Sequence, residues 1–82
     1  MDHRDLQLVF FGMAVDAVGA TRGTLRCPWP VTAEAVRALL LTQFPALVGM
    51  PFHLAQGTAL LSGDAVLQDR LELVILPPFA GG

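Results

Sequence analysis

The hydrophobic positions of this chain fall into short runs that are separated by glycine, proline and polar turns. Two runs are nearly continuous: residues 6–11 stop at Gly12, and residues 71–76 stop at Pro77-Pro78. Short apolar runs with such ends are typical of buried strands, because proline cannot donate a hydrogen bond to a strand ladder. We therefore predict the first and the last strand of a sheet at these two places.

Between these runs, one segment carries the spacing of an amphipathic helix. Thr32 is a favourable N-cap, and Glu34 in the first turn suits the positive end of the helix dipole. Pro45 marks the end, because the residue before a proline is disfavoured in helical conformation. The apolar side chains that recur at helical spacing are Val36, Leu39, Leu40 and Phe44. We predict one main helix that begins at about Thr32.

Three weaker patterns predict further strands. Residues 23–29 form a second strand, joined to the first by a long connection over residues 13–22 that is compatible with one helical turn. From Phe52 onward, plausible turns at Gln56-Gly57 and Ser62-Gly63-Asp64 separate short apolar runs, so two short strands fit there. This order predicts an α+β domain of the β-grasp type, in which one helix crosses one face of a mixed sheet and the first and last strands are parallel in its centre. We assign residues 1–76 to this body and residues 77–82 to an extended tail.

Side chains alternate between the two faces of a strand, so the first and last strands each present one set to the helix and one set away from it. The sets expected beneath the helix are Leu6, Leu8 and Phe10 with Leu71, Leu73 and Ile75. The opposite sets include Val9, Phe11, Val74 and Leu76. We predict that these four form an apolar patch that binds a partner. The alternative is that the connection over residues 13–22, or the segment around Met50, folds over them.

Composition narrows the classes of function. With 82 residues, 54% of them hydrophobic and 15% charged, the chain is expected to fold as one domain with a real core. Its net charge is −2 and its five basic residues, all arginines, are scattered, which argues against nucleic acid as a ligand. No apolar run approaches the roughly 20 residues that span a bilayer, and the charged start precedes no signal-peptide segment. We expect a cytoplasmic protein that contacts no membrane.

The inventory of reactive side chains is short. The chain has no lysine, which removes the phosphate-loop lysine, the Schiff-base nucleophile and the usual side-chain acceptor of a ubiquitin-type tag. Cys27 is the single cysteine, so no internal disulfide forms. It has no histidine nearby to activate it, and we favour a packed thiol over a sulfur-relay role. His3 and His53 lack metal-ligand spacing, so we expect no metal.

The C-terminal residues carry the clearest chemical signal. They are Pro77, Pro78, Phe79, Ala80, Gly81 and Gly82. Two terminal glycines have no side chain to obstruct passage through a narrow site, and the prolines stiffen the root of the tail. Six extended residues reach at most roughly 20 Å. A carboxylate is a poor electrophile, so a tail of this kind is suited to activation by ATP inside an enclosing enzyme.

This ending resembles that of the small subunit of molybdopterin synthase, a ubiquitin-like sulfur carrier family that also includes the thiamine sulfur carrier. In that family an aliphatic strand runs into two prolines, an apolar residue, a small residue and Gly-Gly. Residues 69–72 are similar to the Asp-Gly-Asp-Glu turn of such carriers, with Arg70 at the glycine and Leu71 at an acid. Asp16 lies where an arginine is often found. The resemblance is close over the last seven residues and loose elsewhere.

The resemblance implies a function for the tail. The Gly82 carboxylate would be adenylated by a separate ubiquitin-activating-like adenylyltransferase that uses ATP, and then converted to a thiocarboxylate. The sulfur would build the molybdopterin dithiolene in the active site of a larger synthase subunit, so this chain would not be catalytic alone and would bind no cofactor. Residues 77–81 would thread that site. Phe79 would anchor there, or alternatively fold back onto the body.

Three other functions remain open at this point. The chain could carry sulfur for another pathway, such as thiamine or cysteine synthesis, although the two prolines and the length favour molybdopterin. It could be a protein modifier whose Gly82 forms an isopeptide bond with a target lysine. It could also be a plain ubiquitin-like binding module, for which the terminal glycines would be irrelevant.

Overall fold

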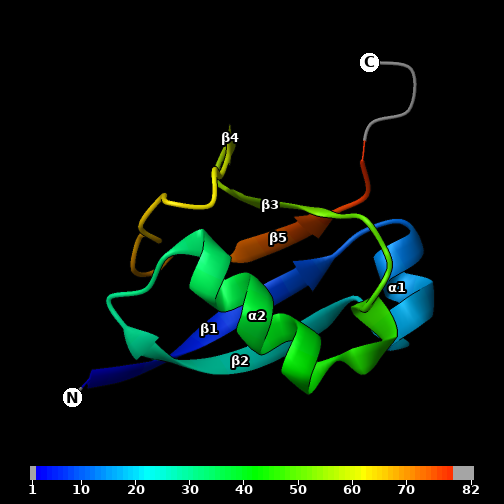
Figure 1. Ribbon diagram of the computed structural model, residues 1–82, viewed down its shortest axis with the longest axis horizontal. Helices are drawn as coiled ribbons and strands as arrows, with labels where there is room; N and C mark the ends of the chain where they lie inside the picture. The colour runs from blue at the N-terminus through cyan, green and yellow to red at the C-terminus, as the bar shows by residue number, and fades with distance from the viewer. Residues whose placement is uncertain (1, 79–82) are drawn as a thin grey trace.

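The apolar runs of the chain assemble into a five-stranded sheet, which the computed structural model describes over residues 2–78 (Figure 1). The strand order is β2-β1-β5-β3-β4. The strands are β1 (Asp2–Phe10), β2 (Arg22–Trp29), β3 (His53–Gln56), β4 (Ala59–Leu60) and β5 (Leu73–Leu76).

The central pair of this sheet is parallel and every other pair is antiparallel. β1 and β5 run side by side from Leu8 opposite Leu73 to Phe10 opposite Ile75. β2 pairs with β1, β3 with β5, and β4 with β3, all antiparallel. The predicted mixed sheet with parallel first and last strands is confirmed.

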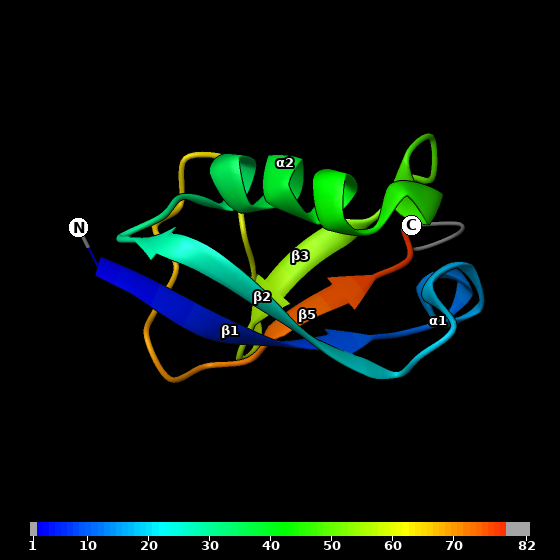
Figure 2. The ribbon, with the colours of Figure 1, turned by 90° about the horizontal axis from the view of Figure 1, so that it is seen from below.

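The main helix is α2 (Ala33–Gln43), and it lies across one face of the sheet (Figure 2). Thr32 is its N-cap, and the Thr32 Oγ1 accepts a hydrogen bond from the Ala35 amide at 3.3 Å. A short 3-10 helix, η1 (Pro45–Leu47), follows at the proline that was expected to end the helix. Val36 and Leu40 are completely buried. The sequence therefore predicted this helix and its buried side correctly.

The core lies between α2 and the sheet. Leu6, Leu8 and Phe10 of β1 and Leu73 and Ile75 of β5 are buried there, as predicted. Their alternation along each strand places the intervening side chains on the other face. Among residues 2–78, no helix covers that face, and the second short helix, α1 (Met13–Val18), lies beyond the end of β1 (Figure 2).

Two predicted strand ends need correction. β1 begins at Asp2, ahead of the predicted residue 6, because its pairing with β2 continues to Asp2 opposite Trp29. β5 begins at Leu73, so Leu71 lies outside the strand with 38% of its surface exposed, and its predicted place beneath the helix is wrong. The cause is a turn: Arg70 has a φ of 70°, a left-handed conformation that interrupts an extended strand.

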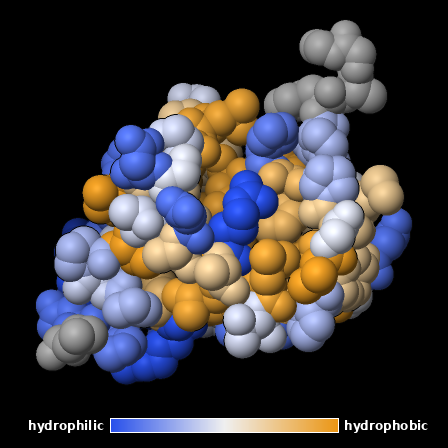
Figure 3. Space-filling model, in the orientation of Figure 1, coloured by the Kyte–Doolittle hydropathy of each residue, from blue (hydrophilic) through white to orange (hydrophobic). Residues whose placement is uncertain are grey.

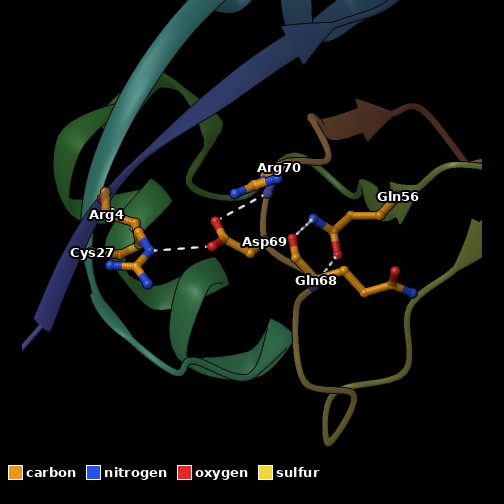
Figure 4. Close-up of polar contacts among 6 residues, drawn as sticks. All are labelled: Arg4, Cys27, Gln56, Gln68, Asp69 and Arg70. Atoms are coloured by element: carbon orange, nitrogen blue, oxygen red, sulfur yellow. Dashed lines mark hydrogen bonds and ion pairs between the residues drawn. The ribbon is translucent and has the colours of Figure 1, made fainter.

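A buried glutamine holds the segment before β5 in place (Figure 4). The Gln56 Nε2 donates to the carbonyl oxygens of Gln68 at 3.0 Å and Leu71 at 3.2 Å, and its Oε1 accepts from the Gln68 amide at 2.8 Å. Gln56 is only 4% exposed, so all three hydrogen bonds are largely shielded from water. One side chain of β3 thus replaces the ladder that a longer β5 would have formed.

We predict that Gln56→Met lowers the free energy of unfolding by about 1 to 3 kcal/mol, because it leaves shielded main-chain groups of residues 68 and 71 without partners. Urea denaturation measures this value. The matched control is Gln68→Met, whose side chain is exposed and should change stability by less than about 0.5 kcal/mol. Equal effects of the two substitutions would contradict the role assigned to Gln56.

Candidate functional site

The tail begins where β5 ends, at the same edge of the sheet as the turn after β1 (Figure 1). Pro77 is half-buried and Pro78 is exposed. Pro77 lies against Gly12 so closely that a Cβ on Gly12 would be 2.9 Å from the Pro77 Cγ. The other predicted tail residues, Phe79, Ala80, Gly81 and Gly82, lie outside the described residues.

An apolar cavity of about 90 Å³ opens beside this tail root. We call it the tail-root cavity, and its lining residues are Met13, Ala14, Met50, Pro51, Phe52, Pro77 and Pro78. Apolar side chains gather on this end of the helix face, around α1 and the segment after η1 (Figure 3). The first described residues of the tail therefore form part of the wall of an apolar recess.

Arg37 of α2 fixes one wall of the tail-root cavity. Its guanidinium donates to the Phe52 carbonyl oxygen at 3.0 Å and lies 4.3 Å from the centre of the Phe52 ring. This combination of a hydrogen bond and a cation–π contact restrains the segment that leads into β3. Arg37 therefore has a structural function here, which sequence reasoning did not identify.

The four residues of the predicted apolar patch occupy neighbouring places on the face away from α2. Val9 of β1 is directly opposite Val74 of β5. The Phe11 amide donates to the Ile75 carbonyl oxygen at 3.1 Å, which continues the register and brings Phe11 next to Leu76. Phe11 is 47% exposed and the other three are half-buried. The connection over residues 13–22 leaves Phe11 uncovered, and Met50 lines the tail-root cavity instead.

Leu60 extends this surface and was missed from the sequence. It is directly opposite Ala55, and Ala55 is directly opposite Val74, so Leu60 shares their face. Its side chain is 55% exposed. A strand of two residues offers no alternation from which its facing could be read. We call the set Val9, Phe11, Leu60, Val74 and Leu76 the open-face patch.

Ion pairs lie at the margin of the open-face patch. The Arg22 guanidinium contacts the Glu72 carboxylate at 2.6 Å, and Arg22 is directly opposite Val9 in the sheet. Both side chains are exposed, so the pair contributes little to stability. An apolar centre with a charged rim is the composition of many protein interfaces. Its role as a partner surface stays a prediction.

Cys27 is completely buried in β2, where its Sγ lies 3.8 Å from the Arg4 carbonyl oxygen (Figure 4). Burial, and then the negative charge of Asp5, raises the pKa of the thiol. Both effects disfavour the thiolate, which is the form that attacks an electrophile. The geometry therefore favours the packed thiol over a sulfur relay.

We expect the Cys27 thiol of the native protein to react with an aromatic disulfide reagent at pH 8 at least about a hundredfold more slowly than in the urea-unfolded protein, because reaction requires opening of the core. Absorbance of the released thiolate follows the reaction. If the native protein reacted as fast as the unfolded protein, the packed-thiol interpretation would be contradicted and a sulfur-relay role would again be open.

The raised pKa of Cys27 also predicts a pH dependence of stability. The free energy of unfolding should fall as the pH rises above roughly 8.5, because the thiol of the unfolded protein ionises first. Cys27→Ala should remove that part of the pH dependence.

Over residues 2–78, His, Cys, Asp and Glu side chains do not come together in a group of three that could hold a metal ion. None of the helices in that range has the length and hydrophobicity that crossing a bilayer requires.

Comparison with known proteins identifies the fold. No protein-family model matches the chain. Similar solved structures include the crystal structure of SAMP1 from Haloferax volcanii, with a TM-score of 0.80 at 15% identity over 96% of this chain and 100% of that chain. A crystal structure of the H. volcanii small archaeal modifier protein 1 gives 0.77 at 13% identity, with the same coverage of 96% and 100%. The solution structure of the H. volcanii HVO 2177 protein gives 0.78 at 24% identity, over 98% of this chain and 88% of that one. The chain thus has the ubiquitin-like β-grasp fold.

Proposed function

We propose that this protein is a carrier whose Gly82 carboxylate is activated and converted to a thiocarboxylate. The observation that supports the proposal most directly is the position of the tail. Pro77 and Pro78 follow the buried parallel strand β5 without a gap, and the Gly81-Gly82 segment comes only two residues later. A rigid body thus precedes a slender segment that can enter the site of another protein.

The proposed chemistry has two steps, adenylation of the Gly82 carboxylate and transfer of sulfur to its acyl carbon. A Gly82 carboxylate oxygen attacks the α-phosphorus of ATP, which forms an acyl adenylate and releases pyrophosphate. Hydrosulfide then attacks the acyl carbon, AMP leaves, and a proton is released with the thiocarboxylate. The acid and base groups for both steps come from the activating enzyme. Cys27, the single thiol, is buried and its raised pKa disfavours the thiolate, so we do not assign it the role of nucleophile in either step.

In this proposal the Gly82 thiocarboxylate donates its sulfur for the synthesis of the molybdopterin dithiolene. The Pro-Pro and Gly-Gly ending, which resembles the small subunit of molybdopterin synthase, supports this choice. A larger synthase subunit then receives the tail and docks on the open-face patch. Thiamine or cysteine synthesis is the alternative consumer. Because ATP and reduced sulfur are both required, the protein acts in the cytoplasm.

A second candidate function is protein modification, and one observation favours it. Two of the similar structures are those of an archaeal protein that is named a small modifier protein. In this function a lysine amine of a target, in place of hydrosulfide, attacks the Gly82 acyl adenylate and AMP leaves. This chain has no lysine, so it is not its own side-chain acceptor.

Mass spectrometry of the full chain separates these functions. After incubation with a ubiquitin-activating-like adenylyltransferase, magnesium, ATP and sulfide, we expect a mass gain that equals the exchange of one oxygen for sulfur, located in the C-terminal peptide. Cys27→Ala should retain the gain, and deletion of Gly82 should abolish it. Isopeptide adducts on target lysines would establish the second function. A gain located on Cys27, or none at all, would rule out sulfur carriage at Gly82.

Substitutions on the open-face patch test the docking surface. We expect Phe11→Ser and Leu60→Ser each to raise the Kd for the larger synthase subunit about tenfold, because exposed apolar anchors lose their contact area. Calorimetry measures Kd, and urea denaturation should show stabilities within roughly 1 kcal/mol of the wild type.

The matched control is Val48→Ser, since Val48 is 64% exposed and follows η1 on the helix side. An equal loss of affinity in Val48→Ser would mean that the patch is not the interface. Unfolding of the Phe11 variant would mean that Phe11 belongs to the core.

A further inference from the structure

Gly12 occupies an unusual position between β1 and α1. Its φ of 58° and ψ of −133° lie in a region that residues with a side chain rarely enter. A Cβ built on Gly12 would lie 2.9 Å from the Cγ of Pro77, 3.4 Å from its Cδ and 3.6 Å from its Cβ. The first of these distances is shorter than any tolerated carbon contact, so this main chain and the tail root meet only because residue 12 is glycine.

The turn that contains Gly12 is held from both sides and has little freedom to retreat. Before it, the Phe11 amide donates to the Ile75 carbonyl oxygen of β5 at 3.1 Å. After it, the Val15 amide donates to the Gly12 carbonyl oxygen at 3.0 Å, which closes the first turn of α1. A side chain at position 12 would therefore displace Pro77 in preference to the turn.

Pro77 also borders the tail-root cavity. Met50, Pro51 and Phe52 line the same cavity, and Arg37 restrains Phe52 through its hydrogen bond and cation–π contact. Pro77 thus contacts the β1–α1 turn and faces a recess that the segment before β3 also lines. Its ring fixes one backbone torsion, so the direction in which the chain leaves Pro78 depends on how Pro77 is seated.

We propose that Gly12 is a positioning residue for the root of the tail: it lets Pro77 seat against the β1–α1 turn, and this contact sets the direction in which the main chain leaves Pro78. The biological meaning of that direction rests on the proposed function, because an activating enzyme must receive Gly82. The contact itself does not depend on that function and is tested separately.

The other glycines supply the control. Gly57 has the same φ of 58° in the turn between β3 and β4, but a Cβ on it would meet nothing within 4 Å. Gly57→Ala therefore introduces backbone strain without a collision, whereas Gly12→Ala introduces both. A difference between the two variants reports the contact with Pro77.

The direct test is a distance measurement. Nitroxide labels on cysteines introduced by Thr42→Cys, on the exposed side of α2, and Ala80→Cys, in the Cys27→Ala background, give a distance distribution by pulsed electron paramagnetic resonance. We expect Gly12→Ala to move or broaden that distribution by on the order of 2 to 3 Å, since a displacement at Pro77 grows along the next residues. Gly57→Ala should leave it unchanged. An unchanged distribution in Gly12→Ala would overturn the proposal.

A double substitution guards against general unfolding. Pro77→Ala removes the Cγ and Cδ atoms and leaves the Cβ at an ordinary contact distance from position 12. Pro77→Ala alone should broaden the distribution, and adding Gly12→Ala to it should then cause no further change. If Gly12→Ala changed the distribution as much in the Pro77→Ala background as it does in the wild-type background, then Pro77 would not be the contact through which Gly12 acts. Circular dichroism confirms which variants are folded.

The functional readout is the adenylation reaction with the unlabelled full chain. We expect Gly12→Ala to raise the KM of the activating enzyme for this protein about tenfold with little change in kcat, because a tail aimed wrongly enters the site less often. Gly57→Ala should stay within about twofold. Equal KM values for Gly12→Ala and Gly57→Ala would mean that the contact of Gly12 with Pro77 has no effect on the adenylation reaction. If the wild type is not activated at all, the proposed function fails, and the distance measurement still decides the role of Gly12.

Discussion

The parallel pairing of β1 with β5 is the constraint on which the rest of this structure depends. Leu8, Phe10, Leu73 and Ile75 are the buried side of that pair, and α2 covers them. Because parallel strands end at the same edge of a sheet, the turn after β1 and the tail after β5 leave the body side by side. The same register places Val9 next to Val74 on the other face. The positions of the tail root and of the open-face patch thus both follow from the pairing of β1 with β5.

Three polar or reactive side chains of the described body have an environment set by packing and main-chain hydrogen bonds. Gln56 satisfies the main chain ahead of β5, Arg37 holds Phe52, and Cys27 is a buried thiol with a raised pKa. A core of this size supplies only roughly 3 to 5 kcal/mol of net stability, so little is left over for strained or charged catalytic groups inside it. The carrier function proposed above would avoid this conflict, because its reactive group lies on the tail and not in the core.

Arg70 shows how the body tolerates a local departure. A left-handed φ costs an ordinary residue about 1 to 2 kcal/mol, and glycine avoids that cost. The backbone at Arg70 therefore has a conformation that glycine would favour. The Arg70 amide donates to the Asp69 side chain at 3.0 Å, and Asp69 in turn contacts Arg4 (Figure 4). Together with Gln56, these contacts hold the turn despite the side chain.

The sequence by itself determined the elements whose signals are local. Thr32 and Pro45 mark the limits of α2 through main-chain hydrogen bonding and sterics, and alternation assigned the faces of β1 and β5. The Gly-Gly ending likewise indicated a slender tail suited to activation, and the sulfur-carrier hypothesis came from the resemblance of that ending to a known family. Only the tertiary structure decided where β5 begins, that Leu60 joins the open-face patch, and that Gly12 meets Pro77. Each of these depends on atoms brought together by the pairing of distant segments. Local sequence preferences depend on neighbouring residues only, so they cannot predict contacts that form when distant segments pair in the sheet.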